Sequence, residues 1–335
     1  MQIRIDEIDL VEMTDDVYFS DKYTNYVSNS RMSLINPSEG GSVEKFINGY
    51  DGGFNPSFII GTAIHELVLQ PELFFLAPNL DKPTAKMGAM ADLLYEIYKN
   101  KQSYTLEDCE KVAIEMDYYT NSLGEKRIQT IYDECTSYVR RRFEYESVLV
   151  NDKEPIYLDP DNIMRAEQAI HHIKNNDEIQ NLLNPLQFIG DEPILKRNED
   201  AIIALITLID KDGREYPLKF KQKMDSFWYD PSINKLMLLD LKTTGRYIDQ
   251  FHYSFYKYRY FRQIGIYALF LSEYIKREYD IENVNIESNI LLSCTIPDFR
   301  SGVFKVNNHM IKHGVWASYE ILKIIMDNYD EIYNK

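Results

Sequence analysis

The chain has 335 residues, of which 44% are hydrophobic and 27% charged, and its formal net charge is −16. This composition is ordinary for a soluble globular protein with a sizeable core, and so large a negative charge argues against broad non-specific coating of nucleic acid. No stretch approaches the roughly 20 apolar residues of a membrane span, and the acidic start MQIRIDEIDLVEMTDD is not a secretory signal.

The three cysteines, Cys109, Cys135 and Cys294, are scattered along the chain and form no CxxC pair. Zinc ribbons and iron–sulfur clusters need closely spaced thiolates, so neither is expected, and no disulfide framework is indicated. Reduced, unpaired thiols are typical of cytoplasmic proteins, and we therefore expect a cytoplasmic location.

After an irregular start, the first half of the chain is expected to be mainly helical. Residues 1–56 look mostly irregular, because turn-forming sequences such as NPSEGGS and DGGFNPS interrupt them. Residues 57–70, SFIIGTAIHELVLQ, form a strongly apolar helix candidate. A helical pattern follows over about 85–149, and one or two further helices are expected over 160–184.

β character begins near residue 186. The runs LQFIGDEPILKR, AIIALITLID, YPLKFKQKMDSFWY and KLMLLDLKTT are short and β-rich, and turn residues separate them. A long helix over about 251–279, two strands over 286–306 and a closing helix over 309–333 complete the pattern.

No internal repeat or clear linker divides the chain, so we expect a single domain over 1–335. Its expected class is mixed α/β (α+β). A mainly helical N-terminal part covers 1–185, and a central mixed β-sheet flanked by helices covers 186–335.

Two acidic residues and a lysine lie on a predicted hairpin. In KLMLLDLKTT, strand alternation puts Asp240 and Lys242 side by side on one face, while Leu241 anchors the opposite face in the core. Asp225 lies in the preceding β-rich run, and the turn DPSIN separates the two runs. If this turn makes the strands antiparallel neighbours, Asp225 approaches Asp240 across the pair.

Two carboxylates in one cleft repel each other unless a cation lies between them, and Mg²⁺ or Mn²⁺ prefers such oxygen ligands. The cation would acidify a water and neutralise charge on a phosphate, while Lys242 would orient that water or stabilise the transition state. Lys221 and Lys223 share the Asp225 face of their strand, so we expect them to contact backbone phosphates. The pattern predicts metal-assisted phosphodiester cleavage.

A plainer interpretation stays open for each of these residues. An isolated D-x-K is more often a surface ion pair, although here it ends the apolar run LMLLDLK. Gln263 and Tyr267, an i, i+4 pair, would hydrogen-bond the nucleophile, Lys242 or the phosphate, or would simply lie at the edge of the core. His65 on an apolar helix is, taken alone, more often a core histidine than a ligand.

Four segments taken in order resemble the PD-(D/E)xK nuclease superfamily, specifically its RecE-like (exonuclease VIII-type) group, which is related to RecB-type nuclease domains and lambda exonuclease. GTAIHELVLQPELF resembles the GxAxHxLLLxPExF segment, and KQKMDSF the (K/R)xRxD segment. LLDLKTT resembles DxKTT, and YRYFRQIGIY resembles YxxQxxxY. The resemblance spans roughly residues 23–330, with Met224 and Lys223 where relatives often have Pro and Arg.

The resemblance implies a restriction-endonuclease-like core and assigns roles to residues of this chain. The implied metal ligands are His65, Asp225, Asp240 and the backbone carbonyl of Leu241. The implied catalytic residues are Lys242, Asp240, Asp225, Gln263 and Tyr267. Weaker matches offer Glu192, in DEPIL, as the first acidic motif. Further implied DNA contacts, besides the two lysines, are Tyr260 and Ser30.

The implied activity is that of a Mg²⁺-dependent exodeoxyribonuclease that digests linear duplex DNA from an end, with Mn²⁺ as a substitute ion. Such enzymes serve phage or prophage recombination together with a single-strand annealing protein, and often form homo-oligomeric rings around DNA. Two alternatives stay open. One is an endonuclease with the same site, and the other is a non-catalytic DNA-end or protein-binding module that retains the fold.

Overall fold

The computed structural model describes residues 1–49, 56–118, 123–148, 153–185, 193–295 and 299–333. The chain forms two compact units: unit 1 consists of Met1–Leu69 and Gln168–Lys335, and unit 2 of Gln70–Glu167. The chain thus leaves unit 1, forms unit 2 and returns. The boundaries between the units do not coincide with the change from helices to sheet that the sequence predicts near residue 185.

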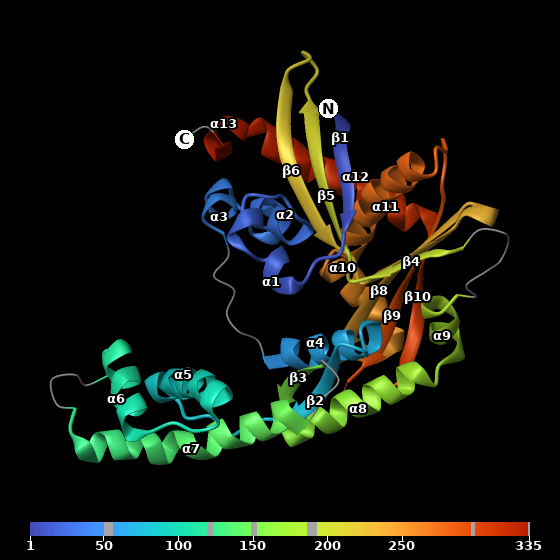
Figure 1. Cartoon of the computed structure of the whole chain (residues 1–335). Coiled ribbons are helices and arrows are strands. Elements are labelled where there is room, and N and C mark those ends of the chain that lie inside the picture. Colours follow the sequence, from blue (N-terminus) through green and yellow to red (C-terminus); the bar gives the residue numbers. More distant parts are fainter. Residues whose placement is uncertain (50–55, 119–122, 149–152, 186–192, 296–298, 334–335) are drawn as a thin grey trace. The chain divides into compact units, whose positions relative to one another are not determined.

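Unit 1 contains a five-stranded mixed sheet with the order β10–β9–β8–β7–β4 (Figure 1). The pair β8/β9 is parallel, and the other pairs are antiparallel. Its strands are β4 (Leu195–Asn198), β7 (Ser226–Asp230), β8 (Lys235–Thr244), β9 (Asn285–Cys294) and β10 (Ser301–Val306). The predicted mixed α/β class is confirmed.

A second sheet in unit 1 has three antiparallel strands in the order β1–β5–β6. They are β1 (Gln2–Val11), β5 (Ala201–Ile209) and β6 (Glu215–Lys223). The expected irregular start is therefore wrong for β1. Apolar residues on both sides of a bulge between Ile5 and Glu7 pack against the core, which is the alternation of a half-buried strand.

One antiparallel ribbon connects the two sheets. β4 and β5 form one arm of the ribbon, and β6 and β7 form the other. The register is the same in both sheets, because Asn198 pairs with Ser226 in one and Ala201 with Lys223 in the other. The run YPLKFKQKMDSFWY, expected as one strand, therefore bends at its aspartate and passes from one sheet to the other.

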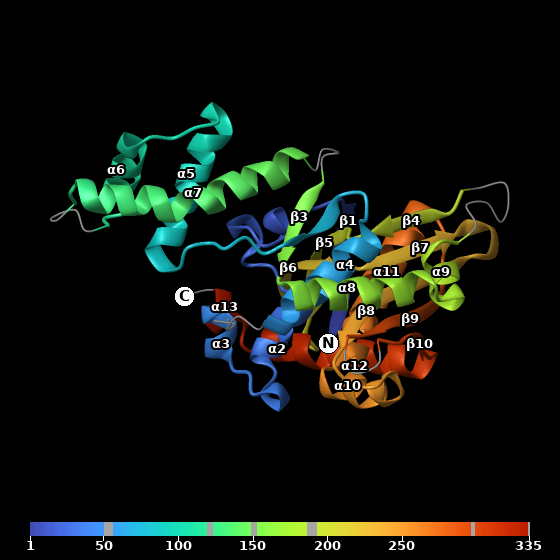
Figure 2. The ribbon, with the colours of Figure 1, turned by 90° about the horizontal axis from the view of Figure 1, so that it is seen from below.

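Helices pack on the five-stranded sheet. α4 (Pro56–Leu69) contacts β8, and both elements are labelled in Figure 2. α11 (Tyr260–Glu278) packs against β8 and β9. The expected helix over 251–279 is instead two helices, α10 (Phe251–Lys257) and α11, because Arg259 between them has a left-handed φ of 58°.

The remaining helices of unit 1 are α1 (Asp15–Tyr18), α2 (Asn29–Ile35), α3 (Val43–Asn48), α9 (Asp177–Leu183), α12 (Asn308–Asp327) and α13 (Tyr329–Tyr333). α11 and α12 approach closely at two glycines, since a Cβ on Gly265 would overlap the backbone of Gly314. Ser318 Oγ donates a hydrogen bond to the Gly314 carbonyl at 2.8 Å. Side chains of any size at this contact would force the helices apart.

Unit 2 combines helices with a two-stranded parallel sheet, and it accounts for the helical pattern expected over 85–149. Its elements are β2 (Phe74–Pro78), α5 (Ala85–Lys101), α6 (Leu106–Glu115), α7 (Glu125–Val148) and β3 (Glu154–Leu158). α8 (Pro160–Lys174) begins in unit 2 and ends in unit 1. Over the part of the chain that the structure describes, no helix is both long and apolar enough to cross a bilayer.

Candidate active site

Three acidic residues of unit 1 lie in register with one another: Glu199 and Asp225 at the bend of the ribbon, and Asp240 on β8. The ribbon places Glu199 opposite Asp225 at its bend, and the Glu199 backbone N–H donates to the Asp225 carbonyl at 3.0 Å. The hairpin β7–β8 then places Asp225 opposite Asp240. Asp225 therefore lies between the other two acids, and its predicted approach to Asp240 follows from the observed register.

Sequence reasoning misses Glu199, because the segment NED looks like a plain turn between strands. Its left-handed φ of 57° is uncommon for a residue with a side chain, and such backbone is found where function or packing requires it. The sequence does contain a signal. KDGR forms the turn of the β5–β6 hairpin, and Glu199 and Asp225 are equally distant from Asp212 at its centre. Counting outward from that turn pairs the two acids.

His65 reaches the acids from α4. Gly61, one helical turn earlier, permits a close approach of α4 to β8, because a Cβ there would lie 3.0 Å from Thr243 Oγ1. His65 Nδ1 lies 3.5 Å from Asp225 Oδ2, and the His65 side chain is 24% exposed. Burial lowers the pKa of His65, and Asp225 only partly opposes this effect. The ring is therefore neutral near pH 7, which is the form that binds a metal ion.

His65, Glu199 and Asp225 each offer a ligand atom within 4.8 Å of the other two, and the described residues contain no other such trio of His, Cys, Asp or Glu. Burial, and then the charge of Asp225, raises the pKa of Glu199 to about 8. Lys223, which lies 3.0 Å from Glu199, opposes this shift only in part, so the two carboxylates are difficult to ionise together unless a metal cation lies between them. This donor set fits a divalent ion. The carboxylate oxygens suit both Mg²⁺ and Mn²⁺, and the imidazole nitrogen favours Mn²⁺, which is a transition-metal ion.

Asp240 is fully buried next to Lys242. Lys242 Nζ lies 2.8 Å from Asp240 Oδ2 and 3.9 Å from Asp225 Oδ2. The contact with Asp240 is an ion pair by distance, but neither carboxylate oxygen of Asp240 has a well-oriented hydrogen-bond donor among the described residues. Because a flexible ammonium group reorients easily, Lys242 and Asp240 form an ion pair at this distance. Asp240 thus keeps acceptor capacity that a ligand or a metal ion would use.

Two opposite effects set the charges of this pair. Burial raises the pKa of Asp240 to about 7, although Lys242 opposes the shift. Burial alone would lower the pKa of Lys242, but Asp240 and then Asp225 raise it above its usual range. Lys242 is therefore a fixed cation, suited to stabilising negative charge on a phosphate.

Gln263 and Tyr267 hydrogen-bond each other. Gln263 Nε2 donates to Tyr267 Oη at 2.6 Å, and Tyr267 Oη donates to the Lys223 carbonyl at 3.0 Å. Burial is the main cause that raises the pKa of Tyr267 well above 10, so its hydroxyl is a neutral donor. The pair holds the end of β6 immediately before the bend at Asp225. Its predicted direct role in catalysis stays a prediction.

Tyr260 and Ser30, the other expected DNA contacts, differ in their surroundings. The Tyr260 ring centroid lies 5.4 Å from Lys242 Nζ, which puts this residue at the site. Ser30 is exposed near the start of α2, where its Oγ lies 3.1 Å from Oγ of Ser28, the N-cap residue of that helix.

The two lysines expected to contact phosphates have partners within the protein. Lys221 is only 7% exposed, and its Nζ donates to the Tyr18 carbonyl at 2.6 Å and lies over the Tyr18 ring. Lys223 forms ion pairs with Asp15 and Glu199. The prediction is therefore wrong for Lys221, because the segment around α1 covers this face of β6. Lys223 is paired with Glu199, the acid opposite Asp225.

Two further predicted site residues have different outcomes. Glu192, the expected first acidic motif, lies outside the described residues. Leu241 presents both of its backbone groups to the site. Its N–H donates to Asp225 Oδ2 at 2.6 Å, and its carbonyl lies 3.5 Å from Lys242 Nζ. A role of this carbonyl as a metal ligand stays a prediction.

Comparison with known proteins finds no family model and no curated protein that matches the chain. Among solved structures, the chain is similar to the crystal structure of a "Putative exonuclease" from Eubacterium rectale. The two are 12% identical, the match covers 94% of this chain and 86% of that chain, and the TM-score is 0.43. This TM-score does not establish a shared fold.

Proposed function

We propose that the chain is a divalent-metal-dependent nuclease of the PD-(D/E)xK type, and that it acts as an exodeoxyribonuclease on the ends of linear duplex DNA. The observation that supports this most is the convergence of His65, Glu199 and Asp225 from separate elements, their ligand atoms lying within 4.8 Å of one another. Beside them lies a buried carboxylate paired with a fixed cation, Lys242.

The proposed roles follow from the contacts. His65, Glu199 and Asp225 hold the ion. Asp240 forms an ion pair with Lys242. A bound Mg²⁺ or Mn²⁺ would acidify a water and neutralise charge on the phosphate. Lys242 stabilises the additional charge that develops on the phosphoryl oxygens, and its partner Asp240 keeps it in place. Glu199 takes the role that the sequence suggests for Glu192.

The choice of an exonuclease over an endonuclease rests on the order and spacing of the segments that resemble RecE-like enzymes. Retention of a histidine, three acids and a lysine in one cluster supports an active enzyme over a binding module, because a module needs no metal ligands. We extend the proposal to magnesium as the usual ion, to action in the cytoplasm, and to a role in phage or prophage recombination. A single-strand annealing protein and a homo-oligomeric ring are the proposed partners.

A single substrate panel tests the proposal. End-labelled linear duplex, nicked circles and closed circles are incubated with Mg²⁺, with Mn²⁺ and with EDTA. The exonuclease releases nucleotides from the linear duplex only when an ion is present, and leaves closed circles intact. Cleavage of closed circles would identify an endonuclease instead.

The binding-module alternative needs its own measurement. Calorimetric titration of the protein with Mn²⁺ should show one site that is lost in Glu199→Gln and Asp225→Asn. If the wild-type protein binds neither ion and cleaves no substrate in the panel, the enzyme assignment is wrong and the module remains.

A further inference from the structure

The surface that follows β8 along the chain is rich in exposed tyrosines. Tyr247 is 48% exposed, Tyr253 63%, Tyr256 48% and Tyr258 56%. We call these four residues the tyrosine surface. Large exposed rings so close together in sequence are typical of binding sites rather than of plain protein surface.

One member of the tyrosine surface, Tyr258, lies next to the candidate active site. The Tyr258 ring centroid lies 5.9 Å from that of Tyr260, and the Tyr260 ring lies 5.4 Å from Lys242 Nζ. Tyr260 also stacks on the buried ring of Phe251, with 5.8 Å between centroids and 9° between planes. An exposed ring is therefore separated from the proposed catalytic lysine by a single, firmly packed tyrosine.

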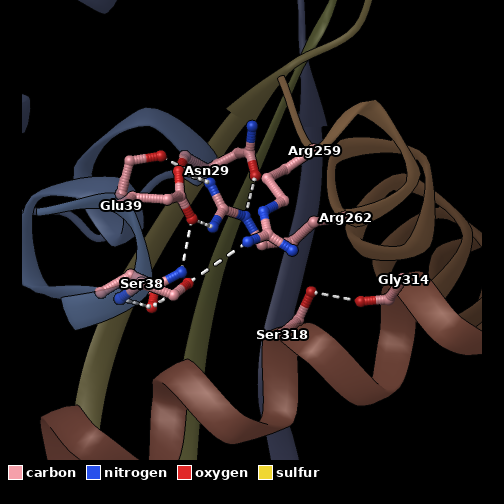
Figure 3. Close-up of polar contacts among 9 residues, drawn as sticks. Asn29, Ser38, Glu39, Arg259, Arg262, Gly314 and Ser318 are labelled. Atoms are coloured by element: carbon pink, nitrogen blue, oxygen red, sulfur yellow. Dashed lines mark hydrogen bonds and ion pairs between the residues drawn. The ribbon is translucent and has the colours of Figure 1, made fainter. Parts of the chain in front are cut away.

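Buried polar contacts hold this surface in one conformation. Arg262, on the first turn of α11, is 2% exposed, and its Nε donates to Asn29 Oδ1 at 2.9 Å while its guanidinium pairs with Glu39 (Figure 3). Arg259, at the turn between α10 and α11, reaches Ser38 Oγ at 3.4 Å. These contacts fix the start of α11 to α2 and the segment that follows α2, so the backbone that carries Tyr258 is held in place before a ligand binds.

The same segment carries positive charge, in contrast to the net charge of −16 of the chain. Residues 245–259 include Arg246, Lys257 and Arg259 but one acid, Asp249, whose carboxylate is paired with Arg300 at 3.3 Å. No acidic residue in the described part of the chain forms an ion pair with the side chain of Arg246 or Lys257. These cations are thus available to an anionic ligand.

We infer that the tyrosine surface binds a single DNA strand by stacking on its unpaired bases, next to the active site. Aromatic rings with nearby cations are the usual means of holding a single strand without sequence preference. Bases inside a duplex stack on each other, and only the terminal pair exposes one face, so several neighbouring rings suit an unpaired strand. The inference rests on the proposed nuclease function, and it names the form of DNA beside the site.

The test measures binding without cleavage. Fluorescence anisotropy in EDTA compares labelled oligo(dT) of about 12 nucleotides, a length within the range of such sites, with a blunt duplex. Tyr258→Ala and Tyr253→Ala should each weaken oligo(dT) binding by about 5-fold or more, and duplex binding by less. Tyr258→Phe, which keeps the ring, should stay within about 2-fold of the wild-type protein.

Trp316→Ala is the control, because Trp316 is a comparably exposed ring (59%) on α12 and is not one of the four tyrosines. Unchanged oligo(dT) affinity in both tyrosine-to-alanine variants, or an equal loss in Trp316→Ala, would overturn the inference and leave the surface to a protein partner. Failure of the proposed function gives a different result. In that case the tyrosine variants lose oligo(dT) binding, but the wild-type protein cleaves no DNA with any ion.

Discussion

The Asp225 carboxylate accepts a hydrogen bond of 2.6 Å from the backbone N–H of Leu241, which ties the start of β7 to β8. The same oxygen, Oδ2, lies 3.5 Å from His65 Nδ1 and 3.9 Å from Lys242 Nζ. One carboxylate oxygen therefore contacts a backbone donor, an imidazole and an ammonium group. Substitutions that remove its charge and its hydrogen bond separately will show which of these contacts serves the fold and which serves the reaction.

Asp225→Asn keeps an acceptor for the Leu241 N–H but loses the charge. We expect it to fold normally and to cleave DNA about 100-fold more slowly or worse. Asp225→Ala also leaves the Leu241 N–H without its partner, so it should lose a further 1–3 kcal/mol or so of unfolding free energy. Urea unfolding and the linear-duplex assay measure the two effects. Equal stability of the two variants would show that the hydrogen bond contributes little.

Lys242→Ala should abolish cleavage and lower the unfolding free energy by about 3 kcal/mol, because it leaves the buried Asp240 carboxylate unpaired. The double variant Asp240→Asn with Lys242→Met removes both charges together. It should recover most of the stability but none of the cleavage. A double variant as unstable as Lys242→Ala would show that the loss comes from packing, not from the unpaired charge.

Glu199 should make stability depend on pH. Its carboxyl has a pKa of about 8 in the folded protein against 4.5 as its ordinary value, so the folded state holds a proton that the unfolded state releases. The contribution of Glu199 to the free energy of unfolding therefore falls as the pH rises from about 4.5 to about 8. Glu199→Gln should be more stable than the wild-type protein at pH 8 by of order 1 kcal/mol or more in EDTA, and nearly equal at pH 4.5.

Metal ions should reverse that order. Mn²⁺ should raise the melting temperature of the wild-type protein at pH 8 more than that of Glu199→Gln, because the variant lacks one ligand. Mg²⁺ should act in the same direction with lower affinity, since an imidazole shares the site. Melting curves at pH 4.5 and pH 8, with each ion and with EDTA, measure both effects. A pH-independent difference between the two proteins would contradict the assignment of the shift to Glu199.

Lys221 and Lys257 should behave oppositely. Lys221→Ala loses the buried hydrogen bond to the Tyr18 carbonyl, so we expect it to cost about 1–3 kcal/mol of stability and to leave DNA affinity unchanged. Lys257→Ala should keep full stability but bind oligo(dT) more weakly, with a shallower dependence on salt. Thermal melting and anisotropy at two salt concentrations separate them. Weaker DNA binding by folded Lys221→Ala would instead support the phosphate contact that the sequence predicts for Lys221.

Cys109 and Cys135 should resist alkylation in the folded protein. Both thiols are completely buried in unit 2, and burial raises the pKa of each to about 12. Iodoacetamide at pH 8 should label neither residue until urea is added, as peptide mass spectrometry will show. Rapid labelling without urea would mean that unit 2 opens readily.

The parts of the site that the sequence predicts are those fixed by local geometry. Alternation along one strand puts Asp240 beside Lys242, and the turn DPSIN sets the register that brings Asp225 opposite Asp240. These relationships need only a strand, a turn and a period of two residues. The mixed class of the sheet follows from the same patterns.

The parts that the sequence does not predict depend on distant contacts. Alternation assigns Lys221 a face of its strand, but whether that face is open depends on a segment about 200 residues earlier, which covers it. The bend at Asp225 cannot be predicted from an unbroken β-rich run. The pairing of Glu199 with Asp225 depends on that bend and is missed with it. His65 comes from a separate helix, and only the resemblance to known nucleases indicates its role.

Because both arms of the ribbon bend at the site, the geometry of the site depends on the orientation of the two sheets. Glu199 and Asp225 lie at the corner where the ribbon passes from one sheet to the other. A rotation of one sheet against the other would alter the ligand distances before any strand pair is broken. A cation held there would cross-link the two sheets at that corner. Removing it with a chelator should therefore speed amide hydrogen exchange in both sheets at once.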